Sequence, residues 1–91
     1  MAATITVDIV APDQTLWSGT ARSVSAPTVE GSIGLLAQHE PVLAVLRAGS
    51  VAVVGEDGAR TEVAIEGGFL SFDQDKVTIV ADAGSGLAAY E

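Results

Sequence analysis

"SVAVVGEDGARTEVAI", residues 50–65, decides the fold class of this chain. Its second half places Val63 and Ile65 on one face and charged residues such as Glu62 on the other. Alternation with a period of two and an abundance of β-branched residues are typical of a half-buried strand. Asp57 and Gly58 lie between the two halves, and this pair favours the positive φ angles of a tight hairpin turn. The stretch therefore predicts a β-hairpin.

The same alternation continues toward both ends of the chain. "ATITVDIV" at 3–10 predicts a strand, and "FLSFDQDKVTIVAD" at 69–82 predicts a second hairpin with "DQDK" as its turn. The intervening Gly67-Gly68 pair predicts a bulge or a close approach of two backbones. "APDQTLWSG" at 11–19 has the composition of a turn that opens at Pro12 and closes at Gly19.

Residues 40–49, "EPVLAVLRAG", fit either a short helix after Pro41 or a buried strand, and we favour the strand. Turn-forming residues recur every 8 to 12 positions along the chain. This spacing is typical of a β-sandwich or a barrel with many short strands.

Composition narrows the classes of function. The chain has 91 residues, enough for one domain, and 48% of them are hydrophobic, which argues against disorder. Twelve acidic against four basic residues give a formal net charge of -8, so nucleic acid and anionic lipid are unfavourable partners. Cysteine is absent, which excludes disulfides, thiolate catalysis and cysteine-bound zinc.

Catalytic motifs are also missing. His39 is the only histidine, and no serine lies in a G-x-S-x-G nucleophile elbow. His39 and Glu40 are adjacent, so on a strand they point apart and cannot share a metal. Lys76 ends the "DQDK" turn, a place where carrier domains present a modified lysine, but the flanking pattern of those carriers is absent. We therefore expect no enzyme activity, no metal and no cofactor.

"EGSIGLLAQHEPVL", residues 30–43, is interpreted as a binding loop. Gly31 and Gly34 would let another backbone approach closely, and Pro41 would fix a corner. Loops on a rigid sandwich are frequent recognition sites. The residues alone therefore favour an interaction module with an unspecified partner.

Five motifs in order resemble one family. They are an extended opening strand at 4–10, "APDQTLWSG", "EGSIGLLAQHEPVLAVLRAG" at 30–49, "GGFLSF" at 67–72 and "VTIVAD" at 77–82. This set is similar to the amino-terminal domain of the epsilon subunit of the F-type ATP synthase. The resemblance implies an all-β fold, a flattened β-sandwich of about ten short strands in two sheets. The sandwich would occupy residues 1–84, and 85–91 would be a flexible tail.

The resemblance also implies a function. Such a subunit is a non-catalytic part of the rotor in the central stalk, and it couples ion translocation to ATP synthesis. It would bind the gamma subunit and the c-ring and meet the alpha/beta head only indirectly. Its place would be the cytoplasmic face of the bacterial plasma membrane, without insertion into lipid. The implied gamma contacts are Ala11, Pro41, Val42, Leu43 and Asp82. The implied c-ring contacts are Glu30, Gly31, Ser32, Ile33, Gln38 and His39.

Two departures from the family qualify these expectations. Ser32 stands where relatives often carry a carboxylate, which weakens the case for a charge-paired contact to the ring. The sequence ends at Glu91, before the two-helix hairpin of typical epsilon subunits. For these residues we expect no ATP site and no inhibition of ATP hydrolysis by the hairpin. The alternative function is a free-standing β-sandwich that acts as a carrier or binds a ligand.

Overall fold

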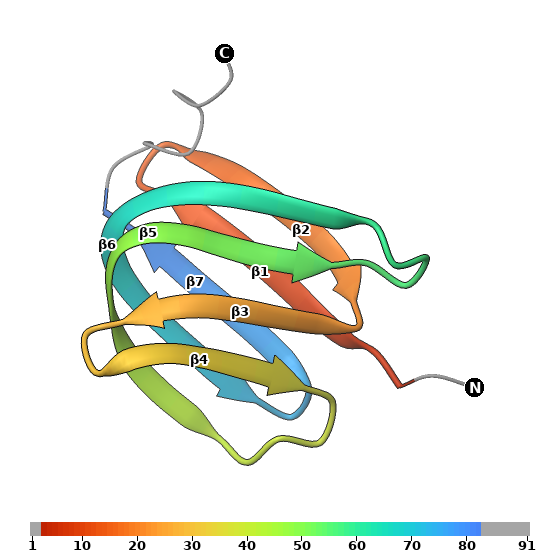
Figure 1. The fold of residues 1–91 in the computed structure, drawn as a ribbon. Helices are drawn as coiled ribbons and strands as arrows, with labels where there is room; N and C mark the ends of the chain where they lie inside the picture. Colours follow the sequence, from red (N-terminus) through yellow and green to blue (C-terminus); the bar gives the residue numbers. More distant parts are fainter. Residues whose placement is uncertain (1–2, 83–91) are drawn as a thin grey trace.

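A computed structural model describes residues 3–82, which form seven strands and no helix. One ladder of hydrogen bonds joins all seven in the order β2-β1-β7-β6-β5-β3-β4 (Figure 1). Residues 83–91 lie outside the described part, and so does the predicted tail at 85–91. The strands are β1 (Ile5–Ala11), β2 (Gln14–Ala21), β3 (Ser23–Thr28), β4 (Gly31–Leu36), β5 (Val42–Val54), β6 (Arg60–Asp73) and β7 (Lys76–Ala81).

The ladder folds over on itself to make the two layers of a sandwich. Figure 1 shows β5 and β6 curving at one side of the molecule, so that each contributes to both layers. These two strands have 13 and 14 residues. The predicted all-β sandwich is therefore confirmed, but with seven strands in one continuous ladder in place of about ten in two sheets. The number is smaller because β5 and β6 each run through both layers, where two short strands were expected in place of each.

The bend in β6 depends on two consecutive glycines. Gly67 and Gly68 have φ angles of +140° and +143°, which residues other than glycine rarely adopt. A Cβ at Gly68 would lie 2.0 Å from the carbonyl oxygen of Val80. The close approach of two backbones predicted for this pair is confirmed.

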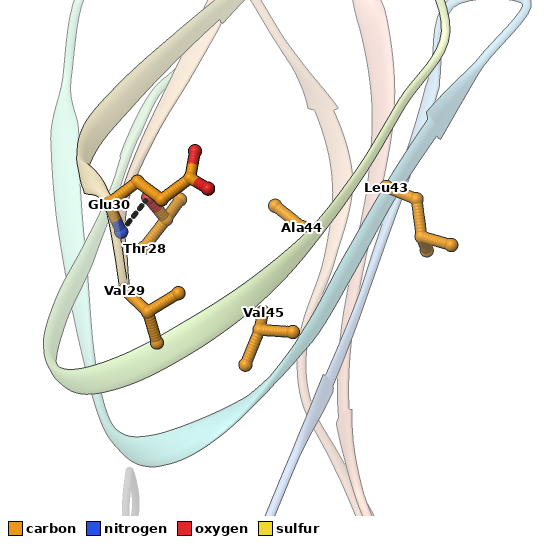
Figure 2. Close-up of a pocket in the computed structure, with 6 residues that line it drawn as sticks. All are labelled: Thr28, Val29, Glu30, Leu43, Ala44 and Val45. Carbon is orange, nitrogen blue, oxygen red and sulfur yellow. Dashed lines mark hydrogen bonds between the residues drawn. The ribbon is translucent and has the colours of Figure 1, made fainter.

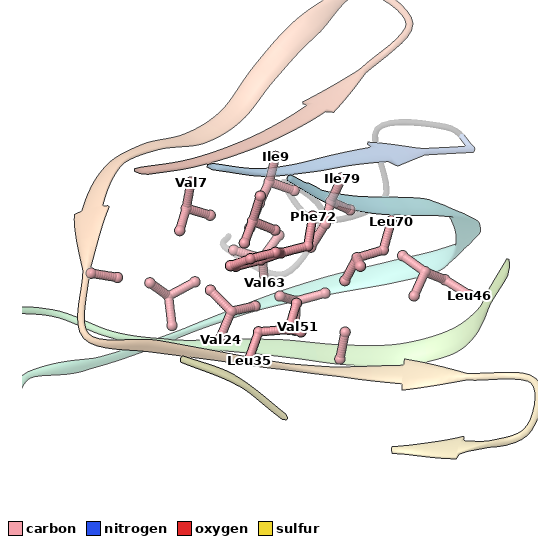
Figure 3. Packing of buried hydrophobic residues seen from close by; sticks show 14 of the residues in the cluster. Val7, Ile9, Val24, Leu35, Leu46, Val51, Val63, Leu70, Phe72 and Ile79 are labelled. Atoms are coloured by element: carbon pink, nitrogen blue, oxygen red, sulfur yellow. The ribbon is translucent and has the colours of Figure 1, made fainter. Parts of the chain in front are cut away.

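The core lies between the two layers (Figure 3). Alternate residues of β1 and of β7 enter it, as the burial of Ile5, Val7 and Ile9 on β1 illustrates. The largest fully buried side chains come from both layers. They are Phe72, Ile5, Ile9, Leu35, Leu70, Ile79, Val7, Val24, Val51, Val53 and Val77.

The two predicted hairpins differ in their turns. β5 and β6 are joined by residues 55–59, where Gly58 has φ +88° but Asp57 does not have a positive φ. This loop is longer than the predicted tight turn. Within it the N–H of Gly58 donates to the carbonyl of Gly55 at 3.0 Å, and the Asp57 carboxylate accepts the N–H of Ala59 at 2.9 Å. The tight turn is at the other hairpin, where Gln74 and Asp75 both have positive φ between the paired residues 73 and 76.

The bounds of β2, β4 and β5 bear on three further predictions. Residues 40–49 contain the start of β5, so the preference for a strand is confirmed. The turn predicted for 11–19 is wrong beyond Pro12 and Asp13, because β2 begins at Gln14. Most of the predicted binding loop at 30–43 is also strand, since β4 covers 31–36 and pairs with β3.

The first and last strands are neighbours. β1 pairs with β7 in parallel, from Thr6 opposite Lys76 to Val10 opposite Val80. β1 also pairs with β2 on its other side, so β1 is an interior strand. The outer strands of the ladder are β2 and β4.

Candidate binding surfaces

The turn between β3 and β4 is held by two side chains, one from β3 and one from β5. The hydroxyl of Thr28 donates to the carbonyl of Gly31 and accepts the N–H of Glu30 at 3.2 Å. Nε of Arg47, on β5, donates to the carbonyl of Thr28 at 3.1 Å. Thr28 is the one polar residue buried among the described residues. The Glu30 turn is therefore fixed in position before any partner arrives.

The glycines beside this turn face open space. A Cβ at Gly31 or at Gly34 would meet nothing within 4 Å. Within the described residues no backbone approaches either glycine, and the prediction that both admit the backbone of a partner stays a prediction. Gly31 is required for a different reason, because its φ is +128°, which a side chain would strain.

The loop at 37–41 is also anchored. The N–H of Gln38 donates to Oδ1 of Asp75 at 2.6 Å, which ties this loop to the β6–β7 turn. The backbone N–H of His39 donates to the carbonyl of Leu36 at 3.2 Å. The His39 ring lies edge-on to Phe72 with centroids 5.7 Å apart, and its Nδ1 is 2.7 Å from the carbonyl oxygen of Glu40. His39 is thus a half-buried structural side chain at a surface.

The residues predicted to face a c-ring follow one edge of the molecule. Glu30, Gly31, Ser32 and Ile33 lie at the start of β4, and Gln38 and His39 lie in the loop after it. β4 is an outer strand of the ladder, so its free edge joins these two groups. They lie at opposite ends of a six-residue strand and would make two contacts along it.

An exposed apolar row crosses the outer face of the opposite layer. Val45 on β5 pairs with Phe69 on β6, and Phe69 pairs with Val80 on β7. Val29 joins the row through its N–H, which donates to the carbonyl of Val45 at 3.0 Å. Exposed fractions in the row run from 46% for Val80 to 61% for Val29. Cross-strand neighbours share a face, so the four side chains (the apolar row) form one apolar patch.

The residues predicted to contact gamma lie on either side of the apolar row. Pro41 directly precedes β5, and Val42 and Leu43 are its first two residues, before Val45; Leu43 is 81% exposed. Ala11 ends β1, and Asp82 directly follows the last residue of its parallel neighbour β7, two residues past Val80. Ala11 is buried, so only its backbone or neighbours could reach a partner.

Sequence reasoning missed all four residues of the row, namely Val29, Val45, Phe69 and Val80. A signal was present in "GGFLSF" and "VTIVAD", where the strand positions facing away from the core carry Phe69 and Val80 in place of polar residues. An apolar residue on the solvent side of a half-buried strand breaks the alternation. The row emerges only when the pairing of β5, β6 and β7 is known.

The surfaces offer binding but little catalytic chemistry. Residues 3–82 contain no cluster of three or more His, Cys, Asp or Glu side chains suited to a metal ion. Nζ of Lys76 lies 3.8 Å from Oδ2 of Asp8 in an exposed pair. The described chain has no helix long and apolar enough to cross a membrane.

Comparison with known proteins identifies the domain. Residues 4–85 match the family described as "ATP synthase, Delta/Epsilon chain, beta-sandwich domain". The ATP synthase epsilon chain of Rhodococcus erythropolis is 48% identical over 82 residues, which cover 89% of this chain and 67% of that protein. The epsilon chain of Micrococcus luteus is 47% identical over 79 residues, with 87% of each chain covered.

Solved structures share the fold. A chain in the cryo-EM structure of the Euglena gracilis mitochondrial ATP synthase (OSCP/F1/c-ring) superposes with a TM-score of 0.82 at 27% identity, over 87% of this chain and 51% of that one. A chain of the Tetrahymena thermophila mitochondrial ATP synthase central stalk and c-ring has a TM-score of 0.69 at 15% identity, over 86% of this chain and 63% of that one. The chain belongs to the ATP synthase delta/epsilon family, of which it contains the β-sandwich domain.

Proposed function

We propose that this chain is a central-stalk subunit of an F-type ATP synthase that binds gamma through the apolar row and the c-ring along β4. The epsilon chain is not the catalytic subunit of ATP synthase, and its contribution here is mechanical. Held by both partners, it couples rotation of the ring to rotation of gamma. This placement puts the domain on the cytoplasmic face of the membrane, as a peripheral part of the complex.

The observation that carries the gamma contact is the exposed apolar row. Three of its residues lie on strands whose inward positions already fill the core, so the outward ones are not needed for folding. Exposed apolar groups that form a continuous patch are typical of protein interfaces. Of the residues predicted by resemblance, Leu43 and Asp82 lie beside the row, two residues before Val45 and two residues after Val80 along the chain.

The c-ring contact is supported by the anchoring of both ends of β4. Thr28 and Arg47 fix the Glu30 turn, and Asp75 fixes the backbone at Gln38. Preorganised loops bind with a smaller loss of conformational entropy. The side chains of Ser32, Gln38 and His39 then offer polar groups to the loops of the ring.

Native mass spectrometry of the chain with its cognate gamma subunit tests the gamma contact. The wild-type chain should form a one-to-one complex, and Phe69→Ser should weaken it by tenfold or more, equal to about 1.4 kcal/mol. Glu62→Gln is the matched control, because Glu62 is exposed on β6 away from the row and pairs only with Arg60 there. If Phe69→Ser and Glu62→Gln bind gamma equally well, the row is not the gamma surface.

A further inference from the structure

The edge of β5 is open where β3 turns away. β3 pairs with β5 as far as Thr28 opposite Leu46, and the last bond runs from Val29 N–H to the Val45 carbonyl. The preceding residues of β5 stay paired with β6 on the other side, from Val42 opposite Phe72 onward. Within the described residues, no strand covers the β3-facing edge of β5 from Val42 to Ala44.

The alternation of an antiparallel strand identifies the free groups. Because the Val45 carbonyl points toward β3, the N–H and carbonyl of Leu43, two residues earlier, point the same way. Ala44 directs its backbone groups to β6 instead. The open edge therefore presents the N–H and carbonyl of Leu43 and the N–H of Val45 in a row.

A groove of about 200 Å³ lies along this edge. Figure 2 shows Val29 and Glu30 on one wall and Leu43, Ala44 and Val45 on the other. The carboxylate of Glu30 extends from its turn toward β5 (Figure 2). Thr28 and Arg47 hold that turn, so the wall is fixed.

We infer that this edge receives an extended segment of the partner that covers the apolar row, which adds to β5 as a further strand. Addition of a strand to an open edge gains main-chain hydrogen bonds and takes specificity from alternate side chains. Val29 and Val45 belong to both the groove and the apolar row, so the two surfaces are continuous. The segment should carry an apolar side chain for Leu43 and Val45 and a Lys or Arg for Glu30, in keeping with the net charge of -8.

This inference rests on the proposed gamma contact and is tested in the same complex by amide hydrogen exchange followed by NMR. In the free chain the amides of Leu43 and Val45 should exchange quickly, whereas the amide of Ala44 is already bonded to β6. On binding gamma, Leu43 and Val45 should slow by tenfold or more, and Ala44 should change little. A one-to-one complex in which Leu43 and Val45 exchange as in the free chain overturns the added strand and leaves the gamma contact standing. Absence of any complex overturns both.

Two substitutions at Leu43 distinguish a main-chain contact with gamma from a side-chain contact. Leu43→Ala removes the exposed side chain, and Leu43→Pro removes the N–H as well. An open edge tolerates proline, and Val42 before it is already extended. Leu43→Pro should bind gamma three- to tenfold more weakly than Leu43→Ala, the worth of one hydrogen bond. Equal affinities of the two variants would contradict a main-chain contact there.

The contribution of the Glu30 carboxylate to gamma binding is tested separately, with Glu62→Gln as the control. Glu30→Gln should weaken gamma binding about threefold at low salt, with a smaller effect at high salt, and Glu62→Gln should not. Protection of Leu43 by the isolated c-ring and not by gamma would overturn the assignment to gamma. Protection that grows with concentration of the chain alone would show that a second copy occupies the edge, and would also overturn it.

Discussion

At the scale of single residues, the structure separates glycines that the backbone requires from one that it does not. Gly68 combines a φ of +143° with a neighbouring carbonyl that occupies the place of a side chain. Gly34 has neither restriction, because its ideal Cβ meets nothing within 4 Å and its φ is ordinary. A side chain can therefore replace the hydrogen of Gly34 but not that of Gly68.

We expect Gly68→Ala to destabilise the domain by roughly 3 kcal/mol or more, because the ladder between β6 and β7 must separate to admit a methyl group. Urea unfolding measures this, with loss of a cooperative transition as the extreme result. Gly34→Ala is the control, and it should leave the free energy of unfolding within about 0.5 kcal/mol. Equal midpoints for the two variants would show that the approach of β7 to β6 is looser than described.

Thr28 gives a second prediction at this scale. Its buried hydroxyl links Glu30 and Gly31, so Thr28→Val should lower the free energy of unfolding by about 1–2 kcal/mol. The same change at the exposed Thr61 should have an effect below about 0.5 kcal/mol. Faster amide exchange at Glu30 in the Thr28 variant would locate the effect in the turn. Unchanged exchange would mean that Arg47 alone holds it.

At the scale of elements, the two hairpins show how turn chemistry can mislead. The Asp-Gly pair that predicts a tight turn sits in a loop of five residues, and the tight turn is formed by Gln74 and Asp75. Glutamine is unusual at a position with positive φ, and Asp75 occupies the second central position, where glycine is preferred. The Asp75 carboxylate accepts the N–H of Gln38, and this bond offsets the cost of the positive φ at Asp75. Gln74 has no such compensation, and its conformation is strained.

Gln74→Gly should therefore raise the free energy of unfolding by up to about 1 kcal/mol, since glycine relieves the left-handed conformation at φ +49°. Thermal and urea unfolding measure the change. Asp73→Gly, one residue earlier and within β6, should act in the opposite sense because it only loosens a strand. A loss of stability in Gln74→Gly would mean that the side chain of Gln74 contributes a contact that outweighs its strain.

Local patterns predict much of this element scale, but not all of it. Strand identity follows from alternation, so the strand at 40–49 and the inward faces of β1 and β7 are predictable from residues such as Ile5 and Ile79. The strand count is not, because nothing near Gly67 in sequence says that β6 continues into the second layer. The apolar row and the open edge at Leu43 depend on which strands are neighbours, which is a property of the whole ladder.

At the scale of the whole molecule, one sign of charge prevails. The net charge of -8 is spread over a small domain, so acidic side chains repel one another across its surface. Only two ion pairs join opposite charges among the described residues, Arg60 with Glu62 and Lys76 with Asp8, and both are exposed. Such pairs offset little of the repulsion.

The melting temperature should consequently rise by roughly 2–5 °C when sodium chloride is raised from about 0.01 M to 0.15 M, as the screening length falls from about 30 Å to 8 Å. Calorimetry measures this. A variant with Glu66→Gln and Asp73→Asn, which removes two exposed carboxylates, should show a smaller rise. A melting temperature that falls with salt in the wild-type chain would mean that favourable pairs outweigh the repulsion.

The parallel pairing of β1 with β7 has a consequence for biosynthesis. A ribosome makes Thr6 long before it makes Lys76, yet the two stand side by side in the finished ladder. Until the last strand emerges, β1 and β2 can form a hairpin but have no other neighbour, and the inner faces of β5 and β6 remain uncovered. Contacts so distant along the chain slow the folding of a domain. The nascent sandwich should therefore close in a single late step, and incomplete chains should be prone to aggregate and to be degraded.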